Sequence, residues 1–289
     1  MIPFGTPHRH VAQCGSTNDL AREWARGPDD PAPSGALVTA DFQTRGRGQR
    51  GRQWQAGWGQ SALMSFVYHS PPAAQTGQLG LVVALAVADA LASLADRVPR
   101  LKWPNDILLD GRKVAGILVE ISAFLHGQEP TPPHKFGSPP QKGGAGGSVP
   151  HRMDAFTSLS SPLGRTPVSE ANREVGSLAV LGIGINVNQE RFVGADEFVY
   201  PPASLRLIRG RSYEVERVVA AVASALAQWE ETWRQDGFLP IVNECRNRLA
   251  VGATVRRGEQ QAQLIGLAPS GAAQVQQADG TFAEWSTVD

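Results

Sequence analysis

Alternating apolar and polar positions predict that much of the chain forms short strands. Runs rich in β-branched and aromatic residues, bounded by glycine or polar clusters, are typical of strands. Such runs cover residues 34–42, 61–69, 100–103 and 177–188. Residues 106–122 predict two further strands around Asp110-Gly111, because this dipeptide favours a tight hairpin turn.

Four other stretches predict helices. The segment GSTNDLAREWARG predicts a helix that Ser16 or Thr17 caps and Gly27 ends. Residues 73–97 predict a long buried helix, because the apolar run within it carries Asp89 and is shorter than the about 20 residues of a membrane span. Two more helices, the second with a proline in its first turn, are predicted over residues 212–237 and 239–249.

The pattern changes twice along the chain. From about residue 250 short strands alternate with glycine turns. This change predicts a large domain over residues 1–249 and a small β-module over residues 250–289. Residues 126–171 hold eight of the 21 prolines and three of the six histidines, and we expect a disordered insertion there. The histidine spacing in this insertion matches no metal-ligand pattern.

Composition narrows the class of protein. The chain has 27 Lys+Arg against 27 Asp+Glu, so it lacks the basic footprint of a protein that coats nucleic acid. Two cysteines do not suggest a disulfide framework. The N-terminal residues contain no apolar run typical of a secretory signal. We therefore expect a cytoplasmic protein that does not enter a membrane.

One loop departs from this neutral balance. The stretch TRGRGQRGRQW, between two predicted strands, places four arginines and three glycines within residues 45–53. Glycine lets a backbone approach a ligand closely, and arginine forks match carboxylate and phosphate oxygens. The loop is consistent with a solvated basic loop, an RNA-binding Arg/Gly segment or a cradle for phosphate.

Three further motifs carry candidate chemistry. LKWPNDIL places Lys102, Asn105 and Asp106 at the end of a strand, where an amide can meet a base edge and a carboxylate can hold a metal ion or accept a proton. GRKVAGILVE contains Lys113 in an otherwise apolar strand, either as a functional group or as an edge-strand lysine that blocks aggregation. GIGINVN ends an apolar strand with glycines and asparagines.

These motifs occur in one order: STND, QTRGRGQRGRQW, KWPND followed by KVAGILVE, and GIGINVN. The ordered set resembles the biotin–protein ligase family over roughly residues 10–120 and 176–250. The resemblance implies an α+β fold, a mixed β-sheet with flanking helices related to the lipoate–protein ligases. It also implies that the C-terminal β-module is a small SH3-like barrel.

The resemblance implies a two-step reaction. Biotin and ATP, with Mg²⁺, would give biotinyl-5′-AMP and pyrophosphate, and a lysine of a biotin carboxyl carrier domain would then displace AMP. Some relatives begin with a DNA-binding domain; here the STND motif begins at Ser16, so we expect a ligase-only form without a DNA target. The sequence leaves open whether the protein forms a homodimer.

The resemblance also assigns residues. The implied catalytic residues are Lys113, Arg47 and Asp106. The implied contacts to biotin are Ser16, Thr17, Asn18, Gln43, Gly46, Arg47, Trp54, Lys113, Gly116, Ile117 and Leu118. The implied contacts to ATP or the adenylate are Arg47, Gln49, Arg50, Arg52, Lys102, Asn105 and Asn186. No metal ligand is assigned, although Asp106 is a candidate for the Mg²⁺ that accompanies ATP.

Alternative functions remain at this point. A lipoate or octanoate ligase or transferase would share the fold, an RNA-binding protein would use the Arg/Gly loop, and an inactive relative would keep the fold alone. The chain also departs from the family pattern at Gln49, where relatives commonly carry arginine in this loop. We expect the loop to hold the adenylate less tightly as a result.

Overall fold

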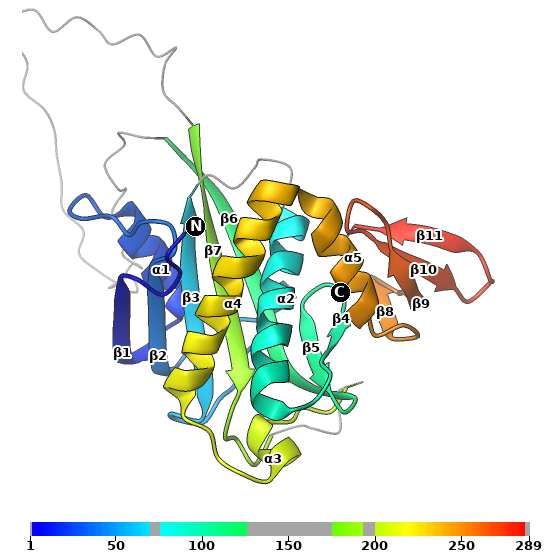
Figure 1. Cartoon of the computed structure of the whole chain (residues 1–289), viewed down its shortest axis with the longest axis horizontal. Helices are drawn as coiled ribbons and strands as arrows, with labels where there is room; N and C mark the ends of the chain where they lie inside the picture. The colour runs from blue at the N-terminus through cyan, green and yellow to red at the C-terminus, as the bar shows by residue number, and fades with distance from the viewer. Residues whose placement is uncertain (1, 70–75, 126–174, 193–199, 287–289) are drawn as a thin grey trace, which may run out of the picture.

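The main body is a seven-stranded sheet with helices on both faces (Figure 1). The computed structural model describes residues 2–69, 76–125, 175–192 and 200–286. The strand order is β1-β2-β3-β7-β6-β5-β4. The strands are β1 His8–Cys14, β2 Leu37–Gln43, β3 Ser61–His69, β4 Arg100–Lys102, β5 Asp106–Leu109, β6 Arg112–Leu125 and β7 Val175–Asn186.

The sheet is mixed, as the family resemblance predicts. Strand β1 runs parallel to β2, and each other neighbouring pair is antiparallel. Strand β1 was not predicted, because this edge strand exposes most of its side chains and so has little apolar pattern. The turn between β5 and β6 confirms the hairpin prediction, because Asp110 and Gly111 have φ values of 48° and 73°.

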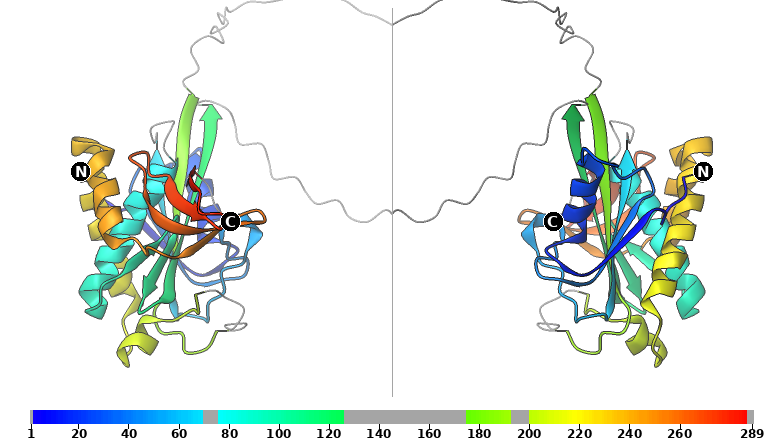
Figure 2. Two further views of the ribbon diagram at one scale, coloured as in Figure 1. Left: turned by 90° about the vertical axis from the view of Figure 1, so that its right-hand side faces the viewer. Right: turned by 90° about the vertical axis from the view of Figure 1, so that its left-hand side faces the viewer.

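Two helical layers cover the sheet. Helices α2 Thr76–Ala95, α4 Val215–Asp236 and α5 Phe238–Arg248 lie on one side, and α1 Thr17–Arg26 lies on the other (Figure 2). Strand β7 shows why helices cover both faces of the sheet. Its Leu181 and Ile183 pack toward α2 and α4, whereas Leu178 and Val180 pack toward α1. Alternate side chains of a strand point to opposite faces, so one strand serves two cores.

Helix α2 confirms the prediction of a buried helix. Its stretch Gly77–Ala95 is long and apolar enough to cross a membrane, but 67% of the most apolar window is buried inside the fold. Both Val82 and Leu85 are fully buried between the sheet and the neighbouring helices. A short helix that the sequence analysis did not predict, α3 Leu205–Arg209, follows β7.

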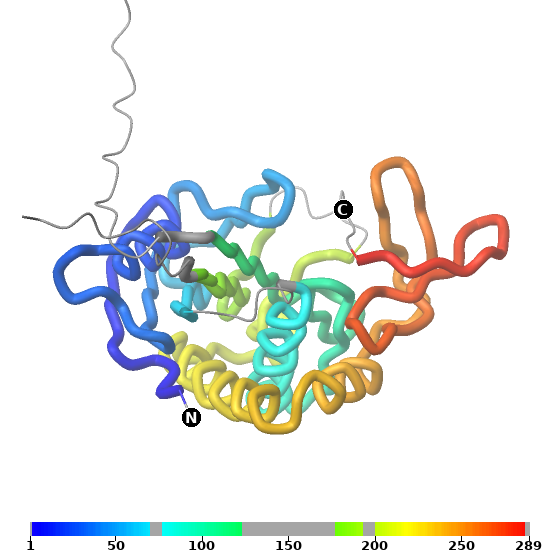
Figure 3. Tube along the Cα trace, turned by 90° about the horizontal axis from the view of Figure 1, so that it is seen from above, coloured from blue at the N-terminus to red at the C-terminus, as the bar shows by residue number. Residues whose placement is uncertain are grey.

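The C-terminal strands form a second sheet. Its order is β11-β10-β9-β8, and each neighbouring pair is antiparallel. The strands are β8 Thr254–Arg257, β9 Gln260–Leu267, β10 Ala273–Gln277 and β11 Phe282–Trp285. Seen from above, this module lies at one end of the main sheet and the N-terminal strands lie at the other (Figure 3). The SH3-like barrel and the domain boundary at residue 250 stay predictions.

The predicted insertion, residues 126–171 with its three histidines, lies outside the described residues. The strands that flank it, β6 and β7, remain paired as far as Leu125 and Val175.

Candidate active site

The floor of the main cavity is the sheet face that α1 also covers. Residues paired across antiparallel strands share a face, and the pairs Gly116–Gly184 and Leu118–Gly182 place three glycines together here. A Cβ atom would lie 2.5 Å from the Trp54 ring if added to Gly184, and 2.8 Å if added to Gly116. These positions require glycine because the indole lies directly against the backbone of β6 and β7.

The Arg/Gly loop, residues 44–54, lies over this floor as a small hairpin. Arg47 and Gln53 form an isolated antiparallel bridge. The backbone N–H of Trp54 donates to the carbonyl of Gly46 at 3.0 Å, and a Cβ on Gly46 would come within 2.5 Å of the Trp54 carbonyl oxygen. The close approach at Gly46 lets the loop reverse and deliver Trp54 to the floor.

One end of the cavity carries neutral hydrogen-bonding groups. Ser16 takes the N-cap position before α1, but its hydroxyl makes no capping hydrogen bond, so the prediction that Ser16 caps this helix is wrong. Ser16 lines the cavity instead. The backbone N–H and hydroxyl of Thr17 donate to Oε1 of Gln43 at 2.7 and 3.1 Å. The fully buried hydroxyl of Ser65 lies 2.7 Å from Thr17 Oγ1 and 2.5 Å from Asn18 Oδ1. Their hydrogen bonds to one another therefore fix the orientation of these groups.

The other end carries charge. Asp106 is 7% exposed, and its two carboxylate oxygens meet Lys113 Nζ at 2.6 Å and Lys102 Nζ at 3.2 Å. Burial raises the pKa of Asp106, but Lys113 and Lys102 together outweigh it, so the pKa lies below its usual range. The ionised cluster of two lysines and one aspartate keeps one excess positive charge, which suits an anionic ligand.

A β-bulge explains how Lys113 reaches the cavity. Strand β5 pairs Ile107 with Ala115 and Leu108 with Lys113, so Val114 is the extra residue on β6. Val114 is fully buried in the core, whereas Lys113 lines the cavity. The edge-strand interpretation of this lysine is wrong, because β6 lies inside the sheet between β5 and β7.

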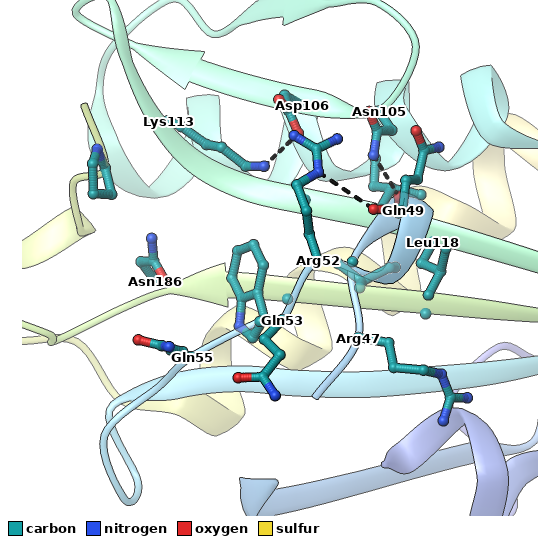
Figure 4. A pocket seen from close by; sticks show the side chains of 18 of the residues that line it. Arg47, Gln49, Arg52, Gln53, Gln55, Asn105, Asp106, Lys113, Leu118 and Asn186 are labelled. Atoms are coloured by element: carbon teal, nitrogen blue, oxygen red, sulfur yellow. Dashed lines mark hydrogen bonds and ion pairs between the residues drawn. The ribbon is translucent and has the colours of Figure 1, made fainter. Parts of the chain in front are cut away.

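The cavity measures about 730 Å³, within the range of small-molecule sites. Most of the residues assigned by resemblance line it (Figure 4). They are Ser16, Thr17, Asn18, Gln43, Arg47, Gln49, Arg52, Trp54, Lys102, Asn105, Asp106, Lys113, Gly116, Ile117, Leu118 and Asn186. Two do not: Gly46 lies against the backbone of Trp54, and Arg50 is exposed at the turn of the loop, η1 Gln49–Gly51, with φ of 57°.

The predicted catalytic trio is only partly assembled. Lys113 and Asp106 are in direct contact, but Arg47 points away from both (Figure 4). The Arg47 guanidinium makes two 2.7 Å hydrogen bonds to the carboxylate of Asp19 on α1.

The two asparagines predicted to contact the nucleotide also make hydrogen bonds within the fold. Asn105 Nδ2 donates to the Ile117 carbonyl at 3.0 Å, and Asn186 Nδ2 donates to the Ala203 carbonyl at 3.1 Å. Both amides therefore hold cavity-lining backbone in place.

Other lining residues were missed. Some lie within the quoted motifs: Gly48 and Gln53 belong to the Arg/Gly loop, and Gly182, Ile183 and Gly184 belong to GIGINVN, so the glycines of these two motifs were their signal. Others come from segments distant in sequence, including the β-module, and had no local signal. The missed lining residues are Gly48, Gln53, Gln55, Met64, Gly182, Ile183, Gly184, Gln189, Phe192, Tyr200, Pro202, Thr254, Val255 and Arg256.

Asp106 does not fit a magnesium ligand in this arrangement. Both of its oxygens already bind lysines, and Mg²⁺ in proteins is usually held by one or two carboxylates with substrate phosphates. The described part of the chain contains no cluster of three His, Cys, Asp or Glu side chains that suits a metal ion. A Mg²⁺ ion at this site would therefore depend on the phosphates of ATP.

Comparison with known proteins agrees with these motifs. Residues 13–126 match the sequence profile described as the biotin/lipoate A/B protein ligase family. The chain is 30% identical over 243 residues to a biotin–[acetyl-CoA-carboxylase] ligase of Paracoccus denitrificans, covering 83% of this chain and 80% of that protein. It is 41% identical over 227 residues to the bifunctional ligase/repressor BirA of Bacillus subtilis, covering 78% of this chain. That match spans only 54% of BirA, about half its length.

Solved structures share the fold. A biotin protein ligase from Aquifex aeolicus in complex with biotin and ATP aligns with a TM-score of 0.68 at 22% identity, covering 98% of this chain and 96% of that one. The mixed sheet with flanking helices is therefore confirmed as the fold of these ligases. With a relative matched over most of both lengths, the chain belongs to the biotin/lipoate A/B protein ligase family, among the biotin–protein ligases.

Proposed function

We propose that this protein uses ATP to attach biotin to a lysine of a biotin carboxyl carrier domain. The observation that carries the proposal is one cavity with two different ends. A preformed neutral end around Thr17 and Gln43 suits the ureido ring of biotin, and a cationic end around Lys113 suits a carboxylate beside a phosphate. The names of the relatives support biotin over a linear acyl substrate.

In the first step, the carboxylate of biotin attacks the α-phosphate of ATP, and the bond to pyrophosphate breaks. Two anions must approach each other, so positive charge has to lie between them. Lys113 is suited to this role because its ammonium group lies at the end of the glycine floor and is held there by Asp106. Lys102 and Arg52 line the same end of the cavity and suit the outgoing phosphates.

In the second step, the amine of the acceptor lysine attacks the biotinyl carbonyl and AMP leaves. The amine must first lose a proton, which passes to solvent water. Asp106 is a weak base because its pKa is lowered by Lys113 and Lys102, so we assign it to orient the amine rather than to accept the proton. Lys113 then stabilises the oxyanion that forms at the carbonyl.

The acceptor is proposed from the name of a relative. The Paracoccus relative is named for acetyl-CoA carboxylase, a class of enzyme whose carrier domain presents one lysine for biotin. We propose a cytoplasmic setting for the reaction, in keeping with the free thiols of Cys14 and Cys245.

A ligation assay tests the proposal. The protein is incubated with ATP, biotin and a purified carrier domain, and the product is detected with labelled streptavidin and by a mass increase on one lysine. Lipoate and octanoate replace biotin in parallel reactions, and an RNA oligonucleotide is titrated at two salt concentrations. Transfer of biotin alone supports the proposal; transfer of lipoate or octanoate, or salt-dependent RNA binding without ligation, would replace it.

A further inference from the structure

The Arg/Gly loop is attached to the rest of the fold through Arg47. Its two terminal nitrogens bind both carboxylate oxygens of Asp19 at 2.7 Å, the paired geometry that makes arginine–carboxylate contacts strong and directional. One of these nitrogens also lies 3.3 Å from Oε2 of Glu120 on β6. A residue of the loop thus contacts α1 and β6 at once, on the far side of the cavity from Lys113 (Figure 4).

Glu120 extends this contact to the neutral end of the cavity. The oxygen that faces Arg47 also accepts hydrogen bonds from Asn18 Nδ2 and Arg22 Nη2, both at 2.8 Å. Asn18 in turn lies 2.5 Å from the hydroxyl of Ser65. The state of the loop and the orientation of the neutral end therefore depend on the same carboxylate.

The electrostatics favour this closed arrangement. Arg47, Asp19 and Glu120 are each only about one third exposed, at 35%, 33% and 29% of their side chains. Hydrogen bonding to Asp19 raises the pKa of Arg47, and hydrogen bonding to Arg47 lowers the pKa of Asp19. With Arg22 included, two arginines face two carboxylates, so the cluster is neutral and its charges are mutually compensated.

We propose that Asp19 and Glu120 form a latch that binds Arg47, holds the Arg/Gly loop over the cavity and couples loop closure to the orientation of Asn18. Arg47 is then a positioning residue and not a group that stabilises the reacting phosphate. This role deepens the proposed function and rests on it, because the closed loop retains biotin and its adenylate. The latch contacts are made by the protein's own side chains, so the latch can be tested without ligation.

The test compares Asp19→Asn, Glu120→Gln and Arg47→Lys with the wild type. Trypsin cleaves after the arginines of the loop, and an open loop is cut faster because a protease acts on the opened state. We expect cleavage within residues 45–52 to speed up about tenfold in Asp19→Asn and Glu120→Gln, and less in Arg47→Lys, which keeps the charge but loses the fork. Thermal melting checks that each variant is folded.

Arg26→Gln is the matched control. Arg26 also joins α1 to β6, through a 2.7 Å hydrogen bond to Ser122, two residues from Glu120. Among the described residues Arg26 makes no hydrogen bond or ion pair with the loop, so the cleavage rate of this variant should equal that of the wild type. If the latch variants are cut no faster than Arg26→Gln, the latch is refuted, whatever the ligation assay shows.

Ligation kinetics separate positioning from chemistry. We expect the KM for biotin to rise about tenfold in Asp19→Asn and Glu120→Gln, the scale of one hydrogen bond to a charged group, with kcat within about twofold of wild type. A fall of kcat by about a hundredfold in Arg47→Lys, with KM unchanged, would overturn the positioning role and make Arg47 catalytic. Unchanged KM and kcat in all three variants would also contradict the coupling.

Discussion

The two ends of the cavity show how one sheet face can serve recognition and chemistry. At the neutral end, Thr17, Gln43 and Ser65 hold one another in position. At the charged end, Lys113 and Lys102 share one buried carboxylate, Asp106, which leaves an excess positive charge. In the first arrangement the polar groups hydrogen-bond to one another, whereas the second has a positive charge that a carboxylate or phosphate can neutralise.

The difference follows from the energetics of burial. Neutral polar groups are buried at small cost when each has a hydrogen-bond partner. A buried charge needs a counter-charge, and removal of one partner leaves the other buried and uncompensated. Changes at the neutral end should therefore weaken binding, and changes at the charged end should affect both the reaction and the stability of the fold.

The largest expected effect is at Lys113. Lys113→Ala should lower the rate of biotin adenylation by about 10²–10³, the usual loss for one positioned electrostatic group. Biotin-dependent exchange of labelled pyrophosphate into ATP measures this step without an acceptor. A circular dichroism spectrum like that of the wild type and a single cooperative melting transition, even at a lower temperature, serve as the folding control. Exchange at the wild-type rate would mean that the charged end is not where the chemistry occurs.

Asp106→Asn probes the stability of the charged end. Loss of the buried carboxylate leaves two lysines unpaired and should destabilise the fold by about 3 kcal/mol at neutral pH. The folded pKa of Asp106 is lowered relative to the unfolded value of about 3.9, so its stabilisation is present above that pH and is lost as the pH falls through the folded pKa. Urea unfolding from pH 7 to pH 3 should therefore show a difference between wild type and variant that shrinks below about pH 4. A difference that stays constant down to pH 3 would contradict the assigned shift.

Thr17→Val removes a hydroxyl from the neutral end at nearly constant volume. The backbone N–H of residue 17 still reaches Gln43, but Ser65 loses a partner. We expect the Kd for biotin, measured by isothermal titration calorimetry, to rise about tenfold, the scale of about 1.4 kcal/mol. The adenylation rate at saturating biotin should change little. A large loss of rate at saturation would show that the two ends are not separable.

The smallest expected effect is at Gln49, in the loop that lies above both ends. Glutamine can hydrogen-bond but has neither the charge nor the fork of arginine. Gln49→Arg should slow the release of biotinyl-5′-AMP without acceptor by a few-fold to about tenfold. Single-turnover release of the labelled intermediate measures the change. Equal release rates in both proteins would place residue 49 outside the contacts to the adenylate.

Much of the fold could be predicted from local sequence patterns. The Asp110-Gly111 turn, the buried helix α2 and the strands β3 and β7 each carry their own signal, because turn chemistry and periodicity act over a few residues. Edge strand β1 had no such signal, since most of its side chains face solvent and its pairing partner lies beyond α1.

The motifs also identified most of the cavity, but not the orientation of its side chains. The sequence marked Lys113 and Arg47 as functional, yet only the register of β5 with β6 turns Lys113 into the cavity. Only the packing of α1 against β6 places Asp19 and Glu120 beside Arg47. Spacing along the chain determines which residues share an element. Which face of a strand a residue occupies depends on the register of strand pairing, and which distant charges Arg47 meets depends on packing between segments 28 and 73 residues apart in sequence.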